Sequence, residues 1–423
     1  MISARTILYV VLSIAVSLPA FLESFLRSSG NATLWVAWAA TLLLLWSSWP
    51  RYESRWLRAA TYGLSVLVVL NLVGSAAIAI LHGEPSPTLP PNRKIELHFV
   101  GRNIEPGIAS EQTITTNAYG HRTNGPVDYR HKPPGVLRLV AIGASTTEDR
   151  KLDDRKTWTN LTAEALASAT GRKVEVINLA LSGVRAKHNY LSLLEAEAYA
   201  PDIVTFLIGI NDWNHVVARE HWSPLRRFLV ELSPMTFGNS PLYRGLKQAN
   251  ESIRLALQRT GGLDDKVVLE EDNTYRESSL DSLARPKTVA FHPTAVDSDY
   301  ARWVGRIFDE CRRKHLFCLF MDQPTAYSAA TPPNLRKRLW MTPPFADYTL
   351  GMDDMIHLSR LYNGWMVDAV KKAGLAFCPL ADKIPATTEY LTDDCHFNEN
   401  GARRVAEIVS TCLIDRRAAY DRR

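Results

Sequence analysis

The chain contains a serine and a histidine whose surroundings suit nucleophilic catalysis. Ser145 follows an apolar run, residues 136–142, through a turn of small residues. A serine hydroxyl becomes an effective nucleophile when a neighbouring base takes its proton. His396 suits that role because Asp393 stands three residues before it, and such a carboxylate can hold the imidazole tautomer and stabilise the imidazolium. Ser145, His396 and Asp393 are therefore the candidate nucleophile, base and orienting acid.

The Asp-x-x-His spacing alone does not single out His396, because it occurs elsewhere in the chain. The other pairs are Asp128 with His131, Asp212 with His215, and Asp354 with His357. His396 differs from these histidines because it follows the last predicted strand. His215 stays as the reserve base because it is close to Asn211, whereas we expect His357 to be solvated or satisfied within the core.

Gly183 and Asn211 follow the next two predicted strands, and both suit an oxyanion hole. The tetrahedral intermediate of acyl transfer carries a negative oxygen that needs preorganised donors. The backbone N–H groups of Ser145 and Gly183 and the side-chain amide of Asn211 offer three such donors. A structural interpretation stays open for each residue, with Ser145 or Asn211 as a helix cap and Gly183 as a tight turn.

Composition and missing motifs exclude several other classes of function. Neither the Gly-x-x-x-x-Gly-Lys phosphate loop nor the G-x-G-x-x-G fingerprint occurs, so nucleotide binding has little support. The net charge of +5 is small for 423 residues, and basic residues are mixed with acidic ones, which argues against nucleic acid as a partner. The five cysteines lack CxxC spacing, suggest no zinc site and leave at least one thiol without an intramolecular partner.

Short apolar runs alternate with helix-periodic segments from residue 135 onward. The alternation predicts a three-layer α/β/α fold with a five-stranded parallel sheet covered on both faces. Ligands of such sheets bind at the carboxyl ends of the strands, where Ser145, Gly183 and Asn211 would lie. The expected strands are residues 136–142, 174–179, 203–208, 316–321 and 375–378, and the expected helices are residues 157–169, 187–199, 298–314, 353–372 and 398–412.

The chain divides into four parts by composition. We expect residues 1–82, which are rich in apolar residues, to form a membrane anchor of about three helices. Residues 83–92, with four prolines, are expected to form a linker that cannot continue a helix. Residues 93–134 form a turn-rich lead-in segment. Residues 135–423 form the hydrolase domain, with insertions at about 213–292 and 324–350 that we expect to determine substrate specificity.

The ordered motifs resemble the SGNH/GDSL hydrolase superfamily over roughly residues 117–412. The matching blocks are Gly143-Ala144-Ser145, Gly183, Gly209 to Asp212, and Asp393 to His396. The resemblance implies a flavodoxin-like fold, Ser145 as nucleophile, Gly183 and Asn211 as oxyanion donors, His396 as base and Asp393 as its orienter. The first block departs from Gly-Asp-Ser by having Ala144, which leaves the nucleophile in place.

These residues predict a serine esterase that needs no metal or organic cofactor. His396 deprotonates Ser145, an acyl-enzyme forms, and water hydrolyses it. The same residues would serve an O-acyltransferase if a sugar hydroxyl replaced water. An alternative from a different class is a non-catalytic membrane protein that binds a glycan at the sheet edge. In that case the same residues would only form loops.

Three apolar stretches precede residue 83, at residues 7–26, 33–49 and 59–81. Each is near the roughly 20 helical residues that span a bilayer core. A signal peptide is the alternative for the first stretch, with Arg5 as its basic end, and buried helices of a soluble bundle are the alternative for all three. The spans make the lipid bilayer an expected partner.

Basic residues set the expected orientation of the spans. Arg5 precedes the first span and Arg51, Arg55 and Arg58 lie between the second and third, whereas the first loop has only Arg27. The positive-inside rule then places the N-terminus in the cytoplasm and the hydrolase domain outside it. An acylated glycan or lipid of the cell envelope is the expected substrate.

Reporter fusions test this topology. A reporter fused after residue 92 should score as exported, and one fused within residues 51–58 should score as cytoplasmic, because the arginines there keep that loop inside. A cytoplasmic score for the fusion after residue 92 would contradict the three-span topology.

Overall fold

The computed structural model describes residues 91–100, 105–220, 266–272, 287–341 and 348–421, together with residues 56, 62, 88 and 89. Nearly all of them belong to one compact unit, Ser86–His221 with Asp264–Arg423. The expected spans, residues 7–26, 33–49 and 59–81, lie outside the described residues apart from residue 62. Among the helices that are described, none is long and apolar enough to cross a membrane.

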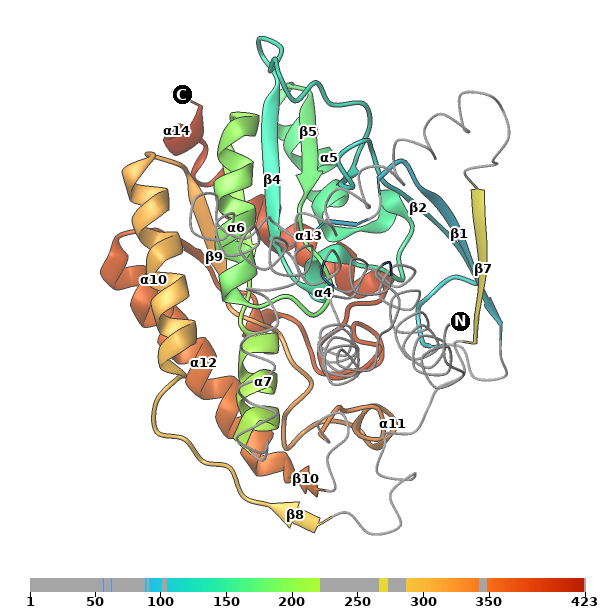
Figure 1. Ribbon diagram of the computed structural model, residues 1–423, viewed down its shortest axis with the longest axis vertical. Helices are drawn as coiled ribbons and strands as arrows, with labels where there is room; N and C mark the ends of the chain where they lie inside the picture. Colours follow the sequence, from blue (N-terminus) through green and yellow to red (C-terminus); the bar gives the residue numbers. More distant parts are fainter. Residues whose placement is uncertain are drawn as a thin grey trace. The chain divides into compact units, whose positions relative to one another are not determined.

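A central sheet organises the described unit (Figure 1). Five of its strands are parallel and match the five predicted runs. A further strand, β3, pairs antiparallel with β5 at one edge, so the sheet is mixed and not purely parallel as expected. This strand has only two residues, Arg122 and Thr123, and both are polar, so it leaves no apolar run in the sequence. The strand order is β11 (Ala376–Cys378), β9 (Cys318–Met321), β6 (Ile203–Leu207), β4 (Leu137–Gly143), β5 (Val174–Asn178) and β3 (Arg122–Thr123).

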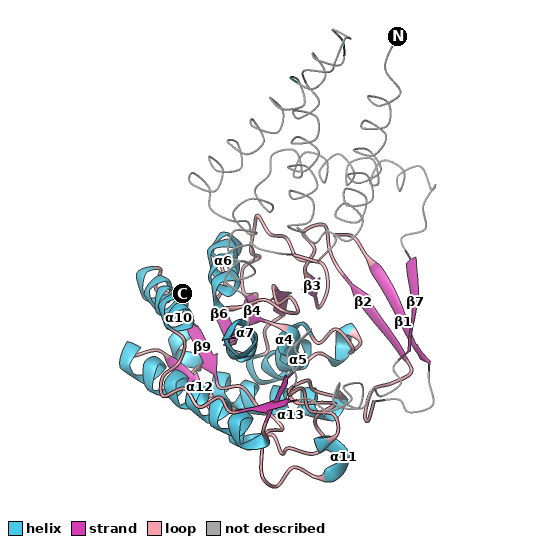
Figure 2. Ribbon diagram, turned by 60° about the horizontal axis from the view of Figure 1, so that its bottom comes forward, coloured by secondary structure: helices cyan, strands magenta, loops and turns pink. Residues whose placement is uncertain are grey.

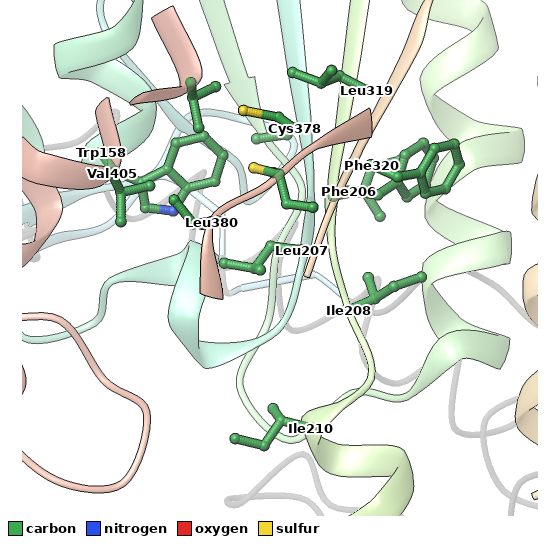
Figure 3. Close-up of a cluster of buried hydrophobic side chains, with 14 of the residues drawn as sticks. Trp158, Phe206, Leu207, Ile208, Ile210, Leu319, Phe320, Cys378, Leu380 and Val405 are labelled. Carbon is green, nitrogen blue, oxygen red and sulfur yellow. The ribbon is translucent and has the colours of Figure 1, made fainter. Parts of the chain in front are cut away.

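Helices cover both faces of this sheet, which is why its central strands are buried throughout and largely apolar. All residues of β4, β5, β6 and β9 are buried. Figure 3 shows Phe206 and Phe320 stacked on one side of the strands, with ring centroids 4.6 Å apart, and Trp158 and Val405 on the other. The hydrophobic core thus has two layers, one on each side of the sheet.

The helices divide between the faces as right-handed crossovers require. The chain passes from β4 to β5 in one direction and then through β6, β9 and β11 in the other, so the direction changes between β4 and β6. Ligands of open α/β sheets bind at such a switch point. In Figure 1, α5 (Trp158–Thr170) and α13 (Glu399–Ile414) lie behind the sheet, and α6 (Ala186–Ala196), α10 (Ser298–Arg313) and α12 (Met352–Ala373) lie in front.

Two small sheets involve the lead-in segment and both expected insertions. Strand β1 (Lys94–Val100) pairs antiparallel with β2 (Glu111–Thr115) and parallel with β7 (Lys266–Asp272), as Figure 2 shows. Strand β8 (Lys287–Val289) pairs with β10 (Tyr348–Leu350). Helix α7 (Ile210–Glu220) runs through residue 213, where the first insertion was expected to begin.

Four of the five cysteines form disulfides, a pairing that the sequence left open. Cys311 on α10 is bonded to Cys318 on β9, and Cys378 on β11 is bonded to Cys412 on α13. Cys395 is free and buried. The second disulfide joins the two elements that flank the loop carrying His396.

A buried ion pair connects the first two parallel strands. Arg138 on β4 and Glu175 on β5 have side chains that are 0% and 3% exposed, and the Arg138 Nη2 to Glu175 Oε2 distance is 2.8 Å. Arg138 also donates to the carbonyls of Tyr199 and Asp128. Lys173 reaches the same carboxylate from a side chain that is 64% exposed.

Arg138→Met should lower the free energy of unfolding by about 3–5 kcal/mol, because it leaves the Glu175 carboxylate buried without its main partner. Lys173→Met is the matched control and should cost less than about 1 kcal/mol, since an exposed partner contributes little. Denaturant unfolding of the purified variants measures both values. Equal losses of unfolding free energy in the two variants would contradict the prediction that burial makes the Arg138–Glu175 pair the more important one.

Candidate active site

The structure brings together the three residues predicted to form the triad. The His396 Nε2 to Ser145 Oγ distance is 2.8 Å, although the two residues are 251 positions apart. His396 Nδ1 lies 2.8 and 2.9 Å from the two carboxylate oxygens of Asp393. With the proton of the neutral imidazole on Nδ1, this N–H donates a hydrogen bond to Asp393, and Nε2 is free to accept the serine proton. This is the arrangement that activates a serine hydroxyl.

Ser145 begins α4 (Ser145–Glu148), a helix of only four residues. A helix this short cannot satisfy its own carbonyls. Buried side chains from other elements donate to them instead, Trp158 Nε1 to Thr146 O at 3.0 Å, Asn178 Nδ2 to Thr147 O at 2.7 Å and Arg122 Nη1 to Glu148 O at 2.6 Å. The nucleophile is thereby held by three parts of the fold.

Gly143 precedes this helix for a steric reason. A Cβ at this position would lie 2.3 Å from Thr147 Oγ1 and 2.8 Å from the carbonyl oxygen of Leu207. The end of β4 therefore tolerates only glycine, as the first block of the sequence motif requires.

The loop carrying His396 is ordered by the carboxylate that also orients the ring. Asp393 Oδ1 accepts hydrogen bonds from the backbone N–H groups of Cys395, at 3.0 Å, and His396, at 2.9 Å. Leu391 and Phe397 form a bridge across the base of the loop. Asn398 then caps α13 by accepting from Gly401 N. One side chain thus sets both the turn and the orientation of the imidazole.

The charges of the loop separate the pKa values of its groups. Burial alone would raise the pKa of Asp393, but the adjacent His396 and its hydrogen bonds lower it to about 2. Burial would likewise lower the pKa of His396, but the charge and hydrogen bond of Asp393, with Asp394, raise it to about 9. The His396 side chain is 38% exposed, so one side of the ring stays open to solvent while both its nitrogens are hydrogen-bonded to protein groups. Asp393 stays ionised while His396 changes its protonation.

Of the two further residues expected in the oxyanion hole, the structure places Asn211 in the pocket with Ser145. Asn211 lines the same pocket as Ser145 and donates one amide proton to Val184 O at 2.9 Å, which leaves its second N–H for a ligand. Gly183 has a positive φ of 79° and is exposed. It is not among the described residues that line the pocket.

A pocket of about 310 Å³ opens at Ser145 and His396. Part of its lining, Arg338, Leu339 and Trp340, comes from the second expected insertion, which the sequence analysis expected to determine specificity without naming these three residues. His215, the reserve base, is not among the described lining residues, and burial lowers the pKa of His215 to about 4. The lining residues are Ser145, Ile210, Asn211, Asn214, Arg338, Leu339, Trp340, Asp393, Asp394, Cys395 and His396.

The pKa of His396 predicts the pH profile of ester hydrolysis. Only the neutral imidazole accepts the serine proton, so kcat/KM should fall as the pH drops below about 9. Asp393→Asn removes the charge that raises this pKa, so the inflection should move to lower pH while the maximal rate falls by up to roughly four orders of magnitude. Rate profiles of both proteins on a neutral ester test this, and an inflection that does not move would contradict it.

Comparison with known proteins agrees with this geometry. The sequence model of the GDSL-like Lipase/Acylhydrolase family matches residues 141–404, which include Ser145 and His396. No curated protein matches the chain.

Similar solved structures are distant in sequence. A putative GDSL-like lipase from Parabacteroides merdae is 11% identical, covers 67% of this chain and 98% of its own, and has a TM-score of 0.37. A GDSL-like lipase from Bacteroides thetaiotaomicron is 12% identical, with coverage of 66% and 88% and a TM-score of 0.34. The psychrotrophic esterase EstA from Pseudoalteromonas sp. is 9% identical, with coverage of 66% and 98% and a TM-score of 0.35.

At these identities and TM-scores the solved structures carry no argument, and the assignment rests on the family model. That model matches more than half of the chain. The interpretation as a non-catalytic glycan-binding protein is therefore set aside. The chain belongs to the GDSL-like lipase/acylhydrolase family and is a serine ester hydrolase.

Proposed function

We propose that this protein is a membrane-anchored esterase that removes O-acyl groups from a glycan or lipid of the cell envelope through an acyl-Ser145 intermediate. The observation that carries the proposal is the 2.8 Å contact between His396 Nε2 and Ser145 Oγ at the pocket. Without a base at this distance the hydroxyl would remain a poor nucleophile.

The reaction follows from the positions of the groups. His396 Nε2 takes the proton of Ser145 as Oγ attacks the ester carbonyl. The negative oxygen receives hydrogen bonds from the backbone N–H groups of Ser145 and Gly183 and from the Asn211 side chain. The imidazolium then protonates the departing alcohol, which leaves an acyl-enzyme. Water repeats the sequence, giving its proton to His396 and releasing the acid. Asp393 stays ionised and stabilises the imidazolium at both steps.

The size of the pocket favours a short acyl group. A volume of about 310 Å³ is at the small end of the range for ligand sites. That volume must hold the acyl group and part of the alcohol together, which suits an acetyl group better than a fatty acyl chain.

The disulfides support a site of action outside the cytoplasm. Both the Cys311–Cys318 and Cys378–Cys412 bonds lie within the hydrolase domain. Disulfides persist in oxidising compartments and are rare in the cytosol. The apolar stretches before residue 83 and the arginines between them favour the same side of the membrane. Envelope glycans and lipids are the acylated molecules found there.

Purified protein should hydrolyse a short-chain aryl ester, and Ser145→Ala should remove that activity because the nucleophile is lost. Ser410→Ala is the matched control, since Ser410 lies on α13 and its hydroxyl donates to Glu407 O. Spectrophotometric rates, labelling by a fluorophosphonate probe and melting temperature are measured on the same preparations. Wild-type turnover by the Ser145 variant would overturn the assignment. Acyl product found on an added sugar instead of as free acid would favour the acyltransferase.

A further inference from the structure

Glu148 is a buried carboxylate that the mechanism above does not use. It ends α4, three residues after Ser145, and is 3% exposed. Its Oε2 accepts both the backbone N–H of Ser182, at 2.5 Å, and the Ser182 hydroxyl, at 2.6 Å. Hydrogen bonds to a charged acceptor are short and about twice as strong as neutral ones. The helix that carries the nucleophile is therefore tied directly to the residue before Gly183.

The same loop is held from its other end by α7. Asn211 Nδ2 donates to Val184 O at 2.9 Å. The carboxylate of Asp212 accepts from Ala186 N at 3.1 and 3.2 Å. The loop of residues 182–186 is thus fixed on both sides of Gly183.

Packing does not fix Gly183 itself. A Cβ added there would meet nothing within 4 Å, and its φ of 79° lies in the left-handed region. The position of its N–H therefore depends on the hydrogen bonds to the flanking residues. Of these, the hydrogen bonds from Ser182 are made to Glu148, which lies on the same short helix as Ser145.

The backbone at Glu148 is rigid enough to transmit this restraint. Arg122 is 3% exposed and donates to the carbonyls of Glu148, Asp149 and Leu152 at 2.6, 3.0 and 2.9 Å. The Glu148 side chain accordingly extends from a fixed point toward Ser182.

We propose that Glu148 is a positioning residue that sets the Gly183 N–H as an oxyanion donor relative to Ser145. This inference rests on the proposed function, because it concerns the transition state of that reaction. An oxyanion donor acts only when it lies about 2.7–3.1 Å from the position of the developing charge. Loss of the restraint should therefore reduce kcat and leave KM nearly unchanged.

The test compares Glu148→Ala with Glu148→Gln on a neutral aryl ester. The Ala variant should lower kcat by roughly 10²-fold, approaching the 10²–10³-fold loss of a whole donor, with KM within about threefold. The Gln variant keeps an oxygen in the same place and should recover most of kcat. Asp202→Asn is the matched control, because this buried carboxylate precedes the amino end of β6, at the opposite end of the strand from the site, and accepts from Arg138 N at 2.7 Å. It should alter the melting temperature but not kcat.

Ser182→Ala keeps the test informative if Glu148→Ala does not fold. On its own, Ser182→Ala should lower kcat with KM nearly unchanged. Where Glu148→Ala folds, its effect on kcat and that of Ser182→Ala should not multiply in the double variant, because both remove the hydrogen bond between the two side chains. Multiplicative effects, or a folded Glu148→Ala protein with wild-type kcat, would overturn the inference. Failure of the proposed function appears differently, as a wild-type protein without esterase activity.

Discussion

The contact between His396 Nε2 and Ser145 Oγ is the interaction on which the rest of the site depends. It joins residues 251 positions apart, and a misplacement of about 1 Å at a catalytic group can cost on the order of 10²-fold in rate. Ser145 and His396 are each held in place by hydrogen bonds with polar groups, because neither the short helix α4 nor the His396 loop is rigid by itself. The carbonyls of α4 are bonded by side chains from three other segments, and the His396 loop is folded around the Asp393 carboxylate.

Two adjacent carboxylates in this loop behave differently because their surroundings differ. Asp393 faces the imidazole, and its pKa is lowered to about 2 although burial opposes this. Burial and the charge of Asp393 raise the pKa of Asp394 to about 7. Divergent pKa values in neighbouring acids are typical of catalytic sites. Near neutral pH the charge of Asp393 is balanced by that of protonated His396, and Asp394 is only partly ionised, so the loop carries little net negative charge to repel an oxyanion in the pocket.

The sequence predicts the parts of this fold that repeat regularly or stand in order along the chain. Five buried strands and the helices between them follow from apolar periodicity, and the triad follows from the order of motifs at their ends. Other features depend on contacts that no local pattern encodes. The pairing of β1 with β7 joins segments that are far apart in the chain, and the two disulfides are one of several possible pairings of five cysteines. Arg338 and Trp340, which line the pocket, follow the short helix α11 (Pro333–Arg336). The burial of Glu148 against Ser182 requires the side-chain direction, which spacing does not give.

The sheet order β2-β1-β7 also has a consequence for how the chain folds during synthesis. Strand β2 follows β1 closely in the chain, but β7 becomes available only after residues 101–265 have been added. At ribosomal speeds this takes on the order of ten seconds or more. Throughout that interval one side of β1, including the buried Leu97 and Phe99, has its backbone groups open to any other extended segment. The nascent chain therefore has a period of exposure to misassociation, which ends when β7 completes the ladder.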